Sequence, residues 1–152
     1  MAEGEAQELP GAVLFACTMN AIRSPMAAAI LAHLAGHRVY VTSAGVRAGE
    51  PDPFIAEVME EIGIDVSTHT PLAIRDLNDT SFDVIVSLSP EAHHQALELT
   101  RTMAVEVEYW PTIDPSLTQG SRAQVLDAYR ALRDQLFQRI RRRFGLAGGP
   151  SV

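Results

Sequence analysis

Cys17, the only cysteine of the chain, stands six positions before Arg23 in the stretch CTMNAIRSP, residues 17–25. The apolar run over 12–16 that precedes this stretch predicts a buried strand. The alanine- and leucine-rich segment 24–36 that follows predicts a helix. A loop that runs from a strand end to a helix N-terminus turns its N–H groups inward, and with the helix dipole it forms a nest for a tetrahedral oxyanion.

The boundary between this loop and the helix is marked twice, because Ser24 is a good N-cap and Pro25 suits the first helical position. Arg23, just before them, can close the ring by donating from its planar guanidinium to two oxygens of the anion. The residues predicted to bind the anion are Thr18, Met19, Asn20, Ala21, Ile22, Arg23 and Ser24.

Cys17 would lie at the base of this nest, where the positive field favours the thiolate. A thiolate beneath a bound phosphate is a nucleophile directed at phosphorus, so Cys17 and Arg23 are candidate catalytic residues. The alternative is an ordinary buried cysteine beside an ordinary helix start. The C-x5-R-S spacing between a strand and a capped helix favours the catalytic interpretation.

A general acid is also needed, because an alkoxide or phenolate leaves poorly without a proton. Asp114 is the candidate, since it lies in the loop 110–115 after a predicted strand, at the same sheet edge as Cys17. The plainer alternative for Asp114 is a turn aspartate before a proline. A second Asp-Pro pair begins at Asp52, which is interpreted as the N-cap of its helix.

Predicted strands and helices alternate along the chain. The strands are expected over 12–16, 38–43, 82–87 and 104–109, and the helices over 24–36, 52–62, 90–102 and 121–144. Apolar strands separated by helices indicate an α/β fold, with a parallel sheet covered by helices on both faces. A single domain is predicted over 11–146, with flexible tails at 1–10 and 147–152.

The composition narrows the classes of function. The 152 residues are 47% apolar, which is enough for one hydrophobic core. All 12 basic residues are arginines, and the absence of lysine excludes Walker-type nucleotide binding and Schiff-base chemistry. The net charge of -7 has the wrong sign for bulk attraction to nucleic acid or an anionic membrane, so neither is an expected partner. A lone cysteine and an acidic N-terminus without an apolar run predict a cytoplasmic protein.

The histidines are not expected to bind a metal. His93 and His94 are adjacent on a predicted helix and point in different directions, while His33 and His37 lack a third ligand, so all four are assigned to the surface. His69 lies in a polar loop and is interpreted as a structural residue.

The segment VLFACTMNAIRSPMA, residues 13–27, resembles the active-site segment of the low-molecular-weight protein tyrosine phosphatases and of the arsenate reductases that share their fold. The family signature is C-x5-R-S after the first strand. The likeness continues at TSAG (42–45), STH (67–69) and IDP (113–115), in the same order along the chain. It implies a four-stranded parallel sheet of order 2-1-3-4, a cysteinyl-phosphate intermediate, and no metal or other cofactor.

The resemblance also assigns roles to residues. It makes Cys17 the nucleophile and Arg23 the phosphate clamp, and it favours Asp114 over Asp52 as the acid. Ser24 would hydrogen-bond the sulfur and stabilise it as a leaving group. The polar network expected to hold the loop in shape consists of Asn20, Ser43 and His69.

The chain departs from the family pattern at the pocket. Met19 stands where the family usually has glycine, and Ile22 stands where it often has a second cysteine that could protect the first as a disulfide. The aromatic walls that accept phosphotyrosine are missing, because 46–48 and 116–118 contain no aromatic residue. Only Tyr109 and Trp110 are near enough in sequence to replace them.

Three functions are compatible with these residues. The leading one is a phosphatase that acts on a phosphorylated protein or a small phosphomonoester through a cysteinyl phosphate. The second is arsenate reduction with an external thiol or glutaredoxin, because arsenate has nearly the shape of phosphate. The third is a weakly active oxyanion-binding regulatory module, although binding alone would need neither the thiol nor the acid.

Overall fold

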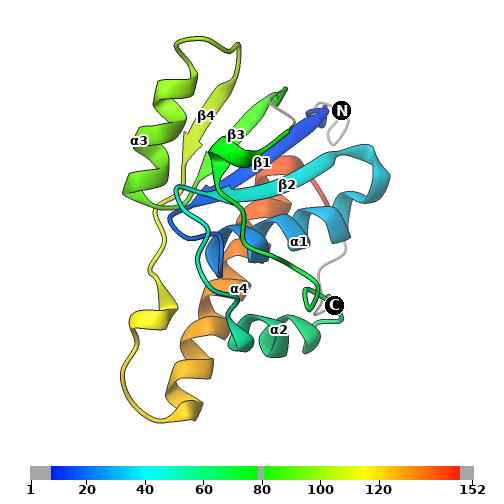
Figure 1. Ribbon diagram of the computed structural model, residues 1–152. Helices are drawn as coiled ribbons and strands as arrows, with labels where there is room; N and C mark the ends of the chain where they lie inside the picture. The colour runs from blue at the N-terminus through cyan, green and yellow to red at the C-terminus, as the bar shows by residue number, and fades with distance from the viewer. Residues whose placement is uncertain (1–7, 79–80, 148–152) are drawn as a thin grey trace.

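The computed structural model describes residues 8–78 and 81–147, and at its centre lies a four-stranded parallel sheet of order β2-β1-β3-β4 (Figure 1). Strand β1 (Ala12–Cys17) pairs with β2 (Tyr40–Gly45) on one side and with β3 (Val84–Ser87) on the other, and β4 (Glu106–Tyr109) extends the sheet beyond β3. The predicted α/β fold and strand order are therefore confirmed. Three of the strands begin two residues later than the sequence predicts.

Helices cover both faces of the sheet, because alternate residues of each strand point to opposite sides. Phe15 of β1 packs in a core with α1 (Arg23–Ala35), α2 (Pro53–Glu60) and α4 (Arg122–Phe144). Its neighbour Leu14 packs on the opposite face with Ala92 and Ala96 of α3 (Pro90–Leu99). Figure 1 shows α1 and α4 on one side of the sheet and α3 beside β4. None of these helices is both long and apolar enough to cross a membrane.

The long helix α4 begins and ends at residues with clear local causes. Ser121 and Gln124 form a capping box, in which the Ser121 hydroxyl accepts from the Gln124 amide and the Gln124 side chain accepts from the Ser121 amide. Gly145 ends the helix in the left-handed conformation, with φ 64°. The predicted tails are largely outside the described residues, which omit 1–7 and 148–152, so the domain boundaries stay predictions.

Two arginines join α4 to the end of α2. Arg133 is 8% exposed and donates to the carbonyl of Val58 and to Glu61, both at 2.8 Å. Arg130 donates to the same carboxylate at 2.9 to 3.1 Å. The hydrogen bonds from Arg130 outweigh the opposing effect of desolvation and, together with those from Arg133, lower the pKa of Glu61 to about 2.

Candidate active site

The loop between β1 and α1 forms a cup at the carboxyl edge of the sheet. Its carbonyls point outward, since those of Cys17, Thr18 and Met19 accept from the amides of residues 46, 47 and 49 at 2.9 to 3.0 Å. The amides of residues 18–22 donate to no acceptor within the described part of the chain. The inner side of the loop therefore carries N–H groups that can bind an anion.

Gly45 allows the neighbouring loop to come this close. A Cβ at this position would lie 2.7 Å from the Asn20 amide nitrogen and 2.9 Å from the Met19 carbonyl carbon. Any other residue would push the two loops apart and distort the cup. In the sequence, Gly45 stands out only as part of the family likeness, because a close backbone approach leaves no signal in a single sequence.

Asn20 holds the shape of the cup from inside the protein. Its backbone is left-handed, with φ 56°, and the residue is fully buried. Its side-chain amide donates to the hydroxyls of Ser24 at 2.8 Å and Ser43 at 3.0 Å, and its side-chain oxygen accepts from the Leu72 amide at 2.9 Å. The ring Nε2 of His69 lies 2.8 Å from the Asn20 carbonyl. The structure thus brings together Asn20, Ser43 and His69, the three residues expected to hold the loop in shape, and joins Ser24 to them.

Cys17 lies at the base of the cup beside Ser24. The Cys17 Sγ is 3.0 Å from the Ser24 Oγ, and both residues are buried. The expectation that Ser24 is the helix N-cap is wrong, since α1 begins at Arg23 and Ile22 occupies the cap position with no side-chain cap bond. Ser24 instead lies in the first turn and directs its hydroxyl toward the sulfur. The first amides of α1 consequently keep their capacity to bind an anion.

Arg23 and Asp114 meet Cys17 in one pocket of about 300 Å³. Arg23 donates from Nη1 to the carbonyl of Thr112 at 3.2 Å, which ties the guanidinium to the loop that carries Asp114. One oxygen of Asp114 accepts from the amide and hydroxyl of Ser116 at 3.0 and 2.7 Å. The full lining of the pocket is Cys17, Met19, Ala21, Ile22, Arg23, Gly49, Glu50, Asp52, Asp114 and Ser116.

Asp52 is the second aspartate of this pocket, and both of its oxygens are engaged. One accepts from the Phe54 amide at 2.8 Å, as the N-cap interpretation predicts. The other accepts from the buried Tyr129 hydroxyl at 2.8 Å. Burial and the negative charge of Asp52 raise the pKa of Tyr129, which keeps this hydroxyl a donor. Among the described contacts, Asp114 accepts hydrogen bonds at Oδ1 alone. Because its second oxygen is not engaged in these contacts, Asp114 is favoured over Asp52 as the proton donor.

Neither suggested aromatic replacement lines the pocket. Trp110 is 2% exposed, packs edge-on against Phe15 and lies beneath the Arg139 guanidinium, so it belongs to the core. Tyr109 stacks on His93 with the ring centroids 4.4 Å apart. Neither ring therefore forms a substrate wall in this structure, because Trp110 fills the core and Tyr109 is stacked on a side chain of α3.

Other polar residues near this edge have structural roles. The Thr18 hydroxyl donates to Ser89, the N-cap of α3, at 2.9 Å and so points away from the pocket. The surface assignment is wrong for His93, whose Nδ1 lies 2.9 Å from the buried Ser87 hydroxyl. His33, His37 and His94 are exposed as predicted. Over 8–78 and 81–147, no three His, Cys, Asp or Glu side chains come close enough to hold a metal ion.

The site includes residues that sequence reasoning did not single out. Gly49, Glu50 and Ser116 line the pocket, and the carbonyl of Thr112 anchors Arg23. Their only sequence signal is their position in the loops after β2 and β4, which a parallel sheet brings to the same edge as Cys17.

Comparison with known proteins points to one family. The family model for low molecular weight phosphotyrosine protein phosphatase matches residues 12–145. A glutaredoxin arsenate reductase of Synechocystis sp. is 31% identical over 128 residues, which cover 84% of this chain and 92% of that protein. An arsenate reductase of Bacillus subtilis is 30% identical over 129 residues, which cover 85% of this chain and 91% of that protein.

Solved structures show the same architecture. An arsenate reductase in a phosphate-binding state is 29% identical with a TM-score of 0.69, and the match covers 89% of this chain and 97% of that one. A low molecular weight protein tyrosine phosphatase from T. tengcongensis has a TM-score of 0.74 at 24% identity, over 89% of this chain and 98% of that one. The second likeness concerns the fold alone.

Proposed function

Because this chain belongs to the low molecular weight phosphotyrosine protein phosphatase family, we propose that it hydrolyses phosphomonoesters through a phosphate held covalently on Cys17. One observation carries the proposal: the Cys17 Sγ lies 3.0 Å from the Ser24 hydroxyl, in a pocket that Arg23 and Asp114 also line. A nucleophile, an anion clamp and a proton donor are the three groups that phosphate transfer to sulfur requires.

In the first step the Cys17 thiolate attacks phosphorus, and the bond from phosphorus to the leaving oxygen breaks. The loop amides and Arg23 hold the three equatorial oxygens, where negative charge is stabilised in the transition state. Asp114 gives its proton to the leaving oxygen, and the alcohol departs. The bond between Arg23 and the Thr112 carbonyl fixes the distance between the clamp and the acid loop.

In the second step water attacks the cysteinyl phosphate, and the bond between sulfur and phosphorus breaks. Asp114, now a carboxylate, takes a proton from the water, and inorganic phosphate is released. Ser24 stabilises the departing thiolate. Its oxygen accepts from the side-chain NH2 group of Asn20, which can only donate, so the hydroxyl hydrogen is available to the sulfur at 3.0 Å rather than to the more distant Ala44 carbonyl at 3.4 Å.

Arsenate reduction is the second candidate, because the curated relatives above are named arsenate reductases. Arsenate would occupy the same loop and accept the same attack from Cys17. Its reduction to arsenite needs two electrons, and a chain with one cysteine cannot supply them by forming an internal disulfide. An external thiol or glutaredoxin would therefore be required.

The two candidates are separated by paired assays on the same preparation. The first measures hydrolysis of p-nitrophenyl phosphate at mildly acidic pH, and the second measures arsenate-dependent thiol oxidation with glutaredoxin and a small thiol supplied. The proposal expects Cys17-dependent hydrolysis and no arsenate-dependent oxidation above the control. Oxidation without hydrolysis would favour the reductase, and phosphate binding without either reaction would leave a regulatory binding module.

A further inference from the structure

The pocket is lined by more acidic than basic side chains. Among the described residues, Glu50, Asp52 and Asp114 line it, and Arg23 is the only cation in the lining. Arg23 lies against the phosphate-binding loop, where a bound phosphate would neutralise it. The parts of a substrate beyond its phosphate therefore face carboxylates.

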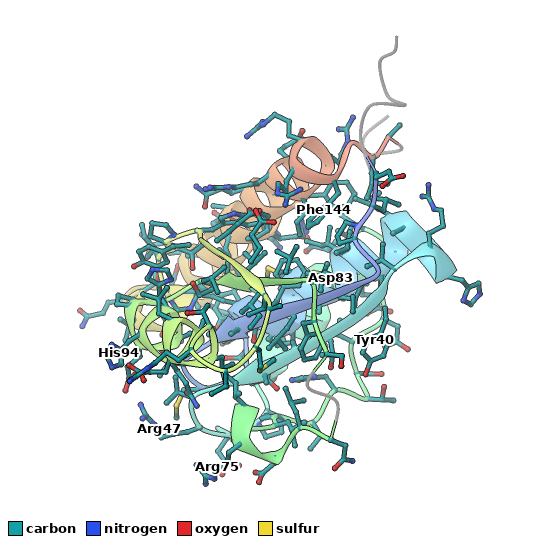
Figure 2. The ribbon with its side chains drawn as sticks, turned by 90° about the horizontal axis from the view of Figure 1, so that it is seen from above. Tyr40, Arg47, Arg75, Asp83, His94 and Phe144 are labelled. Carbon is teal, nitrogen blue, oxygen red and sulfur yellow. The ribbon has the colours of Figure 1, made fainter. Side chains whose placement is uncertain are left out.

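The arginine closest to Glu50 in sequence is paired elsewhere. Arg47 follows β2 in the loop that leads to Glu50, but both of its terminal nitrogens are paired with the carboxylate of Glu91 on α3 at 3.2 Å. Figure 2 shows Arg47 at the periphery of the molecule. Glu50 is exposed and has no ion-pair partner within the described ranges. Its charge is consequently available to a ligand.

An exposed aliphatic side chain lines the same pocket as Glu50. Met19 is 42% exposed and packs on Gly49, where a Cβ would come within 2.9 Å of the Met19 Cβ and 3.3 Å of its Cε. The Gly49 amide also donates to the Met19 carbonyl at 2.9 Å, which fixes the two loops together. Met19 and Glu50 thus line the same pocket, and Met19 contacts the residue that precedes Glu50.

An apolar surface next to a free carboxylate matches a lysine or arginine side chain, whose methylenes pack on apolar groups while the charged end stays in water. We propose that the substrate is a phosphorylated protein segment with a basic residue beside the phosphorylated one. The methylenes of that residue lie on Met19, and its cationic group pairs with Glu50. This inference rests on the proposed phosphatase function and names the substrate class of the same pocket.

Binding of two matched phosphotyrosyl peptides tests the proposal. The peptides differ only in carrying lysine or glutamate on both sides of the phosphorylated residue, and binding is measured by calorimetry on the Cys17→Ser protein, which cannot turn them over. The lysine peptide should bind about fivefold more tightly at low salt, and the difference should shrink as salt screens the charges. Adding Glu50→Gln should reduce the ratio about two- to fivefold.

Glu60→Gln is the control, because it removes the same charge from an exposed position of α2 outside this pocket, and it should leave the ratio unchanged. Equal binding of the two peptides, a ratio insensitive to Glu50→Gln, or binding of inorganic phosphate without either peptide would overturn the proposal. Failure of the phosphatase function would appear separately, as absent turnover by the wild-type chain.

Discussion

Replacing Asn20 by glycine tests whether the hydrogen bonds of this residue, rather than its backbone conformation, maintain the active-site loop. Glycine adopts φ 56° without strain, so in the native state the variant loses only the side-chain interactions. Three side-chain hydrogen bonds disappear, to Ser24, Ser43 and the Leu72 amide. At about 1 kcal/mol for each, the free energy of unfolding should fall by about 3 kcal/mol.

The companion variant Asn20→Ala removes the same hydrogen bonds, and its left-handed backbone costs about 1 kcal/mol of strain. Asn20→Gly avoids this strain but loses a similar amount of stability, because glycine has more conformational entropy in the unfolded state. The two variants should therefore be similar in stability, and both should bind phosphate more weakly. Urea unfolding and phosphate calorimetry measure the two effects. Stability of Asn20→Gly within about 0.5 kcal/mol of wild type, with unchanged phosphate affinity, would show that the position requires only a left-handed backbone.

Arg23→Lys replaces a planar fork by a point charge, so kcat/KM for p-nitrophenyl phosphate should fall by about a hundredfold or more; an active variant with unchanged phosphate affinity would place Arg23 outside the clamp. Asp114→Asn should slow phenyl phosphate far more than p-nitrophenyl phosphate, because the poorer leaving group depends more on the proton; equal loss with both esters would assign the acid elsewhere. Glu61→Gln should make the free energy of unfolding less dependent on pH between 4.5 and about 2. The pKa of Glu61 is lowered from 4.5 to about 2 in the native state, so its contribution is complete above pH 4.5 and is lost as the pH falls toward 2. Unfolding measured at several pH values would contradict this if both proteins lost stability in parallel over that range.

The fold could be predicted because its signals are local and agree with one another. Apolar runs alternating with capped helices specify a parallel sheet, and the strand order followed from the family likeness. The strand starts were less accurate, because residues 38, 82 and 104 continue the strand-like pattern while pairing begins two residues later. The hydrogen bonds between strands depend on where the neighbouring strand lies, and the apolar pattern of one segment does not describe its neighbour.

The predictions that were wrong at the site concern the direction in which side chains point. Ser24 has the propensity of an N-cap, but its hydroxyl turns inward to Cys17 and Asn20. Trp110 follows the acid-loop strand closely enough to suggest a substrate wall, yet it fills the core against Phe15. Glu50 carried no signal, because an exposed glutamate in a loop resembles any other. The Ser24 and Trp110 outcomes depend on tertiary contacts, and local propensity does not report these.

The central claim is that phosphate passes through Cys17, and trapping the covalent intermediate tests it most directly. Wild-type protein is mixed with radiolabelled phosphomonoester and quenched in acid within one turnover, and the labelled residue is identified by peptide mass spectrometry. Label is expected on Cys17 and should disappear on further incubation, while Cys17→Ser should show neither label nor turnover. Steady hydrolysis by Cys17→Ser, or rapid turnover by the wild-type chain with no label on Cys17, would contradict it.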